Sequence, residues 1–117
     1  MLGHPYRYGG DTPAGFDCSG LVYFAAHEAG VDLPRTTGEQ LRAGTPVAQG
    51  DLRPGDLVFM RFPHKSLHVG IMLGREHFLH APASGQSVRV DSLTEPAFAR
   101  AYLGARRPEF PAARSPR

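Results

Sequence analysis

The sequence predicts an α+β fold, a nucleophile-bearing helix packed on a small antiparallel sheet of about five strands. Helical spacing of apolar residues is confined to the first half of the chain, before residue 44. From residue 57 onward the apolar residues instead form short extended runs separated by turn residues. Helices followed by strands are typical of α+β domains with antiparallel sheets. A length of 117 residues allows one domain with a single core.

The first helix carries the only cysteine of the chain. Residues 1–15 are dense in glycine and proline and are predicted to form a loop. Asp17 is a good N-cap and Gly30 a typical C′ residue, so a helix is expected between them with Cys18 at its first position. A helix N-terminus favours the reactive thiolate form of cysteine, but free cysteines are also commonly buried structural residues. Position alone therefore leaves both interpretations open.

A second, shorter helix is predicted after an extended connection over residues 31–34. Thr36 and Glu39 have the spacing of a capping box, with Thr36 as N-cap and Glu39 at N3. This helix is expected to run through Ala43 and to end at Gly44.

The sheet is predicted to begin after a type II turn. Pro54 and Gly55 occupy the second and third positions of that turn, where such residues are preferred. The expected strands are residues 57–62, 67–73, 77–81, 87–91 and 99–106. Residues 108–117 are rich in proline, alanine and arginine and have little to bury, so a frayed tail is expected after a domain of residues 1–107.

Composition indicates an ordinary globular protein. Hydrophobic residues make up 41% and charged residues 21%, and the net charge is +2. The basic residues are scattered and no nucleic-acid-binding motif accompanies them, so no nucleic-acid partner is expected. No apolar run approaches the roughly 20 residues of a membrane helix, and no signal peptide is recognised. One cysteine cannot form an internal disulfide, which leaves the redox compartment open.

Two histidines can complete a catalytic line with the cysteine. His68 and His80 fall on strands joined by a tight turn, and such side chains lie within about 4.5–8 Å, directly or diagonally. A helix packed across the sheet would add Cys18, giving the nucleophile, base and orienting group of cysteine acyl-transfer enzymes. The backbone N–H of Cys18 would serve as an oxyanion donor. Taken singly, each histidine is better explained as a half-buried sheet residue.

A zinc site is the weaker interpretation of the same residues. Cys18, His68, His80 and His64 are all residue types that bind zinc. The chain lacks the paired, closely spaced ligands of structural zinc motifs, so neither a metal nor another cofactor is expected.

Seven short motifs follow one another along the chain. They are Pro5-Tyr6-Arg7-Tyr8-Gly9-Gly10, Phe16-Asp17-Cys18-Ser19-Gly20-Leu21-Val22, Leu33-Pro34-Arg35-Thr36, Leu52-Arg53-Pro54-Gly55-Asp56-Leu57-Val58-Phe59, His68-Val69-Gly70-Ile71, Phe78-Leu79-His80-Ala81-Pro82 and Gly104-Ala105-Arg106-Arg107. In this order, from about Gly3 to Arg107, the chain resembles the NlpC/P60 family of cell-wall cysteine peptidases.

The resemblance implies a papain-like core and hydrolysis of peptidoglycan stem peptides through an acyl-enzyme. The usual bond joins γ-D-glutamate to a diamino acid, either meso-diaminopimelate or L-lysine. The family's nucleophile, base and third polar residue correspond to Cys18, His68 and His80 of this chain.

Three further residues gain roles from the same resemblance. Tyr6 is expected near the thiol and the oxyanion. Asp17 and Ser19, which flank the nucleophile, match positions that help to hold the N-terminal end of the peptide. Asp17 would then be both a helix cap and a ligand for the peptide amine.

The resemblance also sets expectations beyond the site. Family domains carry a helix ahead of the first motif, and only residues 1–4 precede it here, so that helix is expected to be missing. The expected location is the cell envelope, and the expected state is a monomer. Three alternatives stay open: a Cys–His amidase that cuts the sugar–peptide bond, a thiol acyltransferase, and a catalytically silent module that binds wall peptides.

Overall fold

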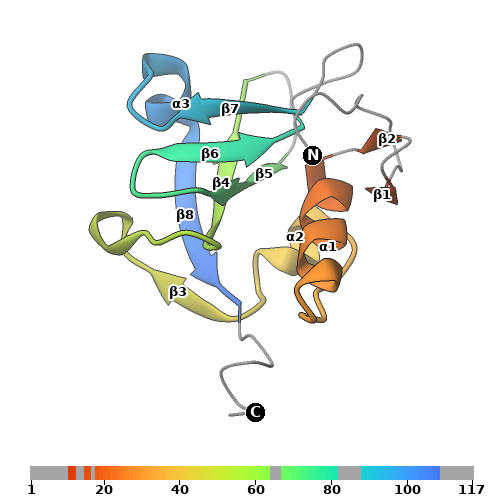
Figure 1. Ribbon diagram of the computed structural model, residues 1–117. Helices are drawn as coiled ribbons and strands as arrows, with labels where there is room; N and C mark the ends of the chain where they lie inside the picture. The colour runs from red at the N-terminus through yellow and green to blue at the C-terminus, as the bar shows by residue number, and fades with distance from the viewer. Residues whose placement is uncertain (1–10, 13–14, 17, 64–66, 82–87, 109–117) are drawn as a thin grey trace.

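The computed structural model describes residues 11–12, 15–16, 18–63, 67–81 and 88–108, and these form the predicted α+β fold (Figure 1). Six antiparallel strands make one sheet in the order β3-β8-β4-β5-β6-β7. The strands are β3 (Thr45–Val47), β4 (Leu57–Arg61), β5 (Leu67–Met72), β6 (His77–His80), β7 (Arg89–Ser92) and β8 (Tyr102–Arg107). The helices are α1 (Cys18–Glu28), α2 (Thr37–Gln40), the 3-10 helix η1 (Gln49–Asp51) and α3 (Pro96–Ala101).

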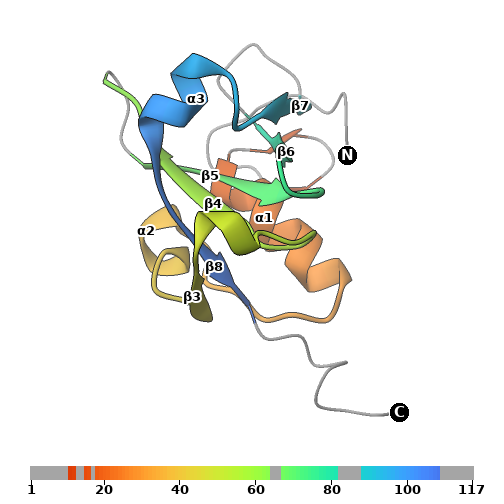
Figure 2. The ribbon, with the colours of Figure 1, turned by 90° about the vertical axis from the view of Figure 1, so that its left-hand side faces the viewer.

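The sheet is buried on both of its faces. Along β4, Leu57 and Phe59 belong to an apolar cluster with Val22 of α1, whereas Val58 and Met60 belong to a second cluster on the opposite face. The second cluster receives Phe98 from α3, so the two helices cover opposite faces (Figures 1 and 2). Burial on both faces explains why β4 reads as a continuous apolar run.

Helix α1 begins and ends where its sequence indicates. It starts at Cys18, and its C-terminus is a Schellman motif in which Val31 N–H donates to Ala26 O and Gly30 N–H to His27 O. Gly30 has a φ of 81°, which confirms the predicted stop, since other residues rarely adopt this conformation.

The cap of α2 is confirmed, but the helix is shorter than expected. The Thr36 hydroxyl oxygen accepts a hydrogen bond from Glu39 N–H, and the hydroxyl donates to the Glu39 carboxylate at 2.8 Å. The α-helix ends at Gln40 rather than Ala43, because Arg42 and Ala43 form tighter bonds to the third residue before them. Gly44 then has the expected left-handed backbone, with φ of 66°.

The type II turn before β4 is confirmed. Gly55 has a φ of 92°, and Asp56 N–H donates to Arg53 O at 3.1 Å. This turn directs the chain into the centre of the sheet.

Two expectations about the strands were wrong, and one edge strand was not predicted. The chain over 99–106 is not one strand, because α3 occupies Pro96–Ala101 and β8 begins only at Tyr102. The sheet has six strands rather than five, since Thr45–Val47 adds an edge strand beside β8. The predicted N-terminal loop contains a small two-stranded sheet of β1 (Asp11–Thr12) and β2 (Gly15–Phe16). Strands of two or three residues are too short to show an alternating pattern in the sequence, so neither pairing was predicted.

Two remaining features concern the ends of the chain and its helices. Pro108, which the sequence assigned to a frayed tail, is buried. Residues 109–117 lie outside the described residues. Residues 1–4 do as well, so the expectation that the family's first helix is missing stays a prediction. None of the described helices is long and apolar enough to cross a membrane.

Candidate active site

His68 and His80 are in direct contact, as the sequence predicted. Their side chains come from β5 and β6, and His68 Nε2 lies 2.8 Å from His80 Nδ1. Ile71 pairs with Leu79 across these strands, so the two histidines are diagonal rather than directly opposite. Both are buried, with exposed fractions of 4% and 1%, which removes water as a competing partner for this hydrogen bond.

Aromatic rings surround the histidine pair. The His80 ring lies 4.6 Å from the ring of Phe78 and 5.6 Å from that of Phe98, measured between centroids, and Phe62 approaches His68 at 5.9 Å. Phe98 comes from α3, a helix that the sequence analysis did not predict and whose last residues, 99–101, it assigned to a strand. The element that was missed therefore supplies one wall of the site.

Gly70 allows β6 to approach β5 closely at this point. A Cβ atom on Gly70 would lie 2.7 Å from Phe78 Cδ2 and 3.4 Å from the Cβ of His80. The absence of a side chain two residues after His68 is thus a packing requirement of the site.

A carboxylate that the sequence analysis missed extends the histidine pair. His80 Nε2 lies 2.7 Å from Asp91 Oδ2. Asp91 Oδ1 accepts a hydrogen bond from Arg89 at 3.1 Å, and Oδ2 forms an ion pair with Arg89 Nε at 3.0 Å. Because Phe78 pairs with Asp91 and His80 with Arg89, Asp91 lies diagonally across from His80. The available signal was Asp91 at the end of the strand predicted over 87–91, but the sequence did not indicate the register of that strand.

Cys18 occupies the first position of α1, half-buried. Its Sγ lies 3.6 Å from the hydroxyl of Thr37, and its side chain packs against the cluster that holds Val22, Phe59 and Val69. Val69 directly follows His68, so the start of α1 packs against the strand that carries the proposed base. Transfer of a proton between the thiol and His68 stays a prediction.

Ser19 is tied to the segment that precedes α2. Its buried hydroxyl accepts a hydrogen bond from Arg35 at 2.9 Å. Gln40 Nε2 donates to the backbone oxygens of both Ser19 and Pro34, and Gln40 Oε1 has no hydrogen-bond partner among the described residues. These contacts fix the residues around Thr37 against the first turn of α1.

Two predicted site residues cannot be placed. Tyr6 and Asp17 lie outside the described residues, so their expected roles stay predictions. In the part of the chain that the structure describes, no group of three or more His, Cys, Asp or Glu side chains is arranged to hold a metal ion.

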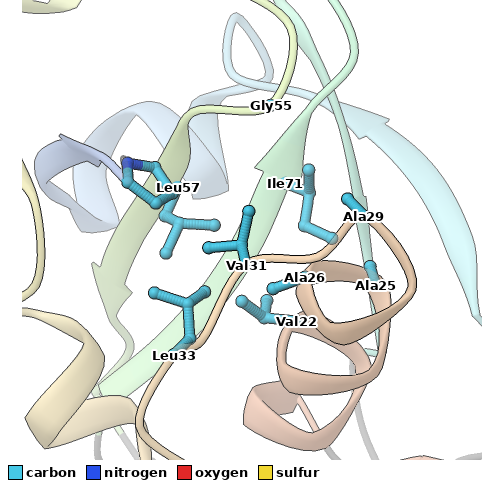
Figure 3. Close-up of a pocket in the computed structure, with 10 residues that line it drawn as sticks. Val22, Ala25, Ala26, Ala29, Val31, Leu33, Gly55, Leu57 and Ile71 are labelled. Carbon is cyan, nitrogen blue, oxygen red and sulfur yellow. The ribbon is translucent and has the colours of Figure 1, made fainter. Parts of the chain in front are cut away.

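The molecule also has an apolar pocket of about 160 Å³, lined by the C-terminal half of α1, the following loop and strands β4 and β5 (Figure 3). Its side chains include Val22, Val31, Leu33, Leu57 and Ile71, whereas Cys18, His68 and His80 do not line it. Its lining side chains are all apolar and include none of the proposed catalytic residues, so this pocket is separate from the candidate active site.

Comparison with known sequences gives a consistent set of relatives. Residues 3–107 match the NlpC/P60 family. The chain is 42% identical over 113 residues to the murein DD-endopeptidase MepH of Escherichia coli, covering 92% of this chain and 42% of that protein. It is 37% identical over 110 residues to a gamma-D-glutamyl-L-lysine dipeptidyl-peptidase of Bacillus subtilis, covering 92% and 37%. The chain thus spans about half or less of the length of these relatives.

Solved structures with the same fold agree. An NlpC/P60 family protein from Bacillus cereus superposes with a TM-score of 0.84 at 35% identity, covering 92% of this chain and 36% of that one. The NlpC/P60 domain of the peptidoglycan hydrolase SagA gives 0.76 at 37% identity, covering 89% and 86%. A single such domain therefore accounts for nearly all of the present chain.

Proposed function

This chain belongs to the NlpC/P60 family, and we propose that it is a cysteine peptidase that hydrolyses peptidoglycan stem peptides. The observation that carries the proposal is the contact between His68 Nε2 and His80 Nδ1, inside a buried aromatic shell. With Nε2 engaged in this way, Nδ1 is the ring nitrogen through which His68 would exchange a proton with Cys18. Related murein endopeptidases support the substrate class.

The proposed reaction proceeds through a thioester. Cys18 gives its proton to His68, and the sulfur attacks the carbonyl carbon of the amide. The C–N bond breaks as His68 returns the proton to the leaving amine. A water molecule then attacks the thioester, its proton passing through His68 to the sulfur, which releases the carboxylic acid and restores the thiol.

Other residues of the chain assist in this scheme. The backbone N–H of Cys18 and the side chain of Tyr6 would stabilise the oxyanion. Asp17 and Ser19 would hold the N-terminal end of the peptide, and the hydrogen bond from Arg35 would orient the Ser19 hydroxyl. All of these residues come from one chain, so we propose that the domain acts as a monomer, at the cell envelope where its substrate lies.

Two bonds are candidates. One is the γ-D-glutamyl–diamino acid bond, as in the name of the Bacillus subtilis relative. The other is the D,D peptide bond of a cross-link, as in the names of the Escherichia coli murein DD-endopeptidases. One of these is 44% identical to this chain over 103 residues. We place the γ-D-glutamyl bond first, because it is the usual bond of the resemblance, and the D,D bond second.

Mass spectrometry of purified muropeptides after incubation with this protein distinguishes these possibilities. Release of L-Ala-γ-D-Glu identifies the first bond, and conversion of cross-linked dimers into monomers identifies the second. Release of an intact stem peptide from the sugar would indicate an amidase instead. No product at high protein loading, with Cys18→Ala as the matched blank, would contradict a peptidase and favour a silent binding module.

Treatment with a chelator and with an alkylating agent tests the thiol mechanism. EDTA is expected to leave hydrolysis unchanged, whereas iodoacetamide is expected to abolish it with a single adduct on Cys18. Activity that is lost to EDTA and restored by zinc would show that the mechanism depends on a metal.

A further inference from the structure

Four polar residues form a continuous line that starts at the surface and ends at the proposed base. Arg89 holds Asp91, Asp91 Oδ2 lies 2.7 Å from His80 Nε2, and His80 Nδ1 lies 2.8 Å from His68 Nε2. Exposure falls along this line, from 56% for the Arg89 side chain to 9% for Asp91 and 1% for His80. The line thus leads from water into the aromatic shell.

The proton positions along the line follow from the chemistry of its acidic member. A carboxylate only accepts hydrogen bonds, so the ring proton of His80 must be on Nε2. In a neutral imidazole the other nitrogen is then an acceptor, which requires His68 to donate from its own Nε2. The lone pair of His68 is left on Nδ1, the nitrogen required for general-base chemistry.

Arg89 supports the neutral form of His80. It donates a hydrogen bond to Asp91 Oδ1 at 3.1 Å and forms an ion pair with Oδ2, 3.0 Å from its Nε, and so shares the negative charge that would otherwise draw a second proton onto His80. The rings of Phe78 and Phe98 add to this effect, because a charged imidazolium is poorly solvated among them.

We propose that Asp91 is a positioning residue of the reaction, which fixes the tautomers of both His80 and His68 and so makes His68 Nδ1 basic. Its importance to catalysis rests on the proposed function, since it presupposes that His68 serves Cys18. Its effect on the two rings does not depend on any substrate and is measurable by itself.

Nitrogen-15 NMR of histidine-labelled protein near neutral pH tests the assignment directly, because protonated and unprotonated ring nitrogens have well-separated chemical shifts. Signals are assigned with His68→Asn and His80→Asn. The expected result for the unmodified chain is protonation at Nε2 and a lone pair at Nδ1 in both rings. Protonation of both nitrogens of His80, or of Nδ1 in His68, would overturn the proposal before Asp91 is altered.

Asp91→Asn provides the matched perturbation, because an amide is nearly the same size but can donate. Donation from its NH₂ group to His80 Nε2 would move the His80 proton to Nδ1 and the His68 proton from Nε2 to Nδ1. We expect both rings to change tautomer, iodoacetamide to alkylate Cys18 more slowly, and hydrolysis to fall by about ten- to a hundred-fold. Unchanged tautomers together with normal hydrolysis in the folded variant would refute the role of Asp91.

Two controls separate this proposal from others. Asp56→Asn makes the same chemical change at a buried aspartate that contacts neither histidine, and should leave both tautomers as they are. Arg89→Gln removes the charge partner but keeps the carboxylate, so the His80 proton should stay on Nε2, whereas the second proton, on Nδ1, should be gained at a higher pH than in the unmodified chain. A tautomer change in Asp91→Asn without any muropeptide hydrolysis by the unmodified chain would refute the proposed function and support the positioning of the rings.

Discussion

Asp56 and Asp91 are both shielded from water and both paired with an arginine. Asp56 lies in the turn before β4 and Asp91 on β7, and the two have different further partners. Asp56 accepts from Arg107 at 2.8 Å and 2.9 Å and from the backbone N–H of Arg53 at 2.9 Å. Asp91 accepts from Arg89, and its remaining contact is with the imidazole of His80. The two carboxylates thus share a charge partner of the same kind and differ in what else they hold.

The difference lies in whether the partners exchange protons. The hydrogen bond to Asp56 raises the pKa of Arg107 above its already high usual value, so no proton leaves this pair. Arg107 also donates to the backbone oxygen of Asp51, and the group ties the turn before β4 to the end of β8. A carboxylate among fixed donors stabilises the fold, whereas one bonded to an imidazole also sets the proton positions of that ring.

The largest expected effect comes from replacing His68, the proposed base, with a residue that cannot exchange a proton. Asparagine at position 68 cannot accept and return a proton, so His68→Asn should lower muropeptide hydrolysis by about 10²–10⁴-fold. It should also slow alkylation of Cys18 near neutral pH. Both rates are measured on protein whose fold has been checked by circular dichroism.

His80→Asn sharpens that result, because an amide oxygen can still accept from His68. It should retain more activity than His68→Asn and near-normal alkylation, while His80→Ala should lose more than His80→Asn. Equal losses in His68→Asn and His80→Asn would show that base and orienting residue have been assigned wrongly.

Asp56→Asn tests the other carboxylate by its effect on stability. An amide accepts through one oxygen only, which leaves buried donors without a partner, so the free energy of unfolding should fall by about 1–3 kcal/mol. Urea denaturation measures this loss, and hydrolysis per folded molecule should remain within about two-fold. A large loss of activity in fully folded Asp56→Asn would break the proposed division between the two aspartates.

Gly70→Ala changes the packing around His80 without changing any charge or hydrogen-bonding group. The added methyl group would lie 2.7 Å from Phe78 Cδ2, so Phe78 and the neighbouring His80 must shift. Overpacking of this kind costs about 1–3 kcal/mol, and we expect a several-fold loss of hydrolysis along with it. Gly104→Ala is the matched control, since a methyl group at this position on β8 would have nothing within 4 Å. If both variants behaved alike, the close approach at Gly70 would have no functional importance.

The smallest effect is expected at Tyr102, near Asp56. Burial, and secondly the charge of Asp56, raises the pKa of Tyr102 above its usual value of 10.0. The folded state therefore holds the phenol proton more tightly, and this stabilisation is complete below about pH 10 and is lost as pH rises through the folded-state pKa. Tyr102→Phe should remove that alkaline loss, as measured by urea denaturation across this pH range.

At neutral pH the same variant should be at least as stable as the unmodified chain. The Tyr102 hydroxyl is buried and has no hydrogen-bond partner among the described residues, so its removal should raise the free energy of unfolding by up to about 1 kcal/mol. A clear loss of stability at pH 7 would mean that the hydroxyl has a partner that contributes to the fold.

Much of the local structure followed from the sequence, because its causes are local. The start of α1 at Cys18 and its stop at Gly30 depend on residues within one or two turns. The cap at Thr36 and the turn at Gly55 depend on groups three residues apart. The contact between His68 and His80 was also predictable, since a tight turn joins their strands and leaves few possible registers.

Tertiary structure alone decided the rest. Phe98 lies in the site because Pro96–Ala101 form a helix, whereas the sequence analysis predicted a strand from residue 99 and no element at Phe98. Asp91 is the partner of His80 because of the register in which β7 pairs with β6. The segment that connects these two strands has no short turn motif from which that register could be predicted. A shift of one residue would have turned Asp91 to the opposite face of the sheet, because side chains alternate along a strand. Sequence thus identified Cys18, His68 and His80 as the groups capable of the chemistry. Only the pairing of β6 with β7, which local pattern does not determine, showed that Asp91 contacts His80.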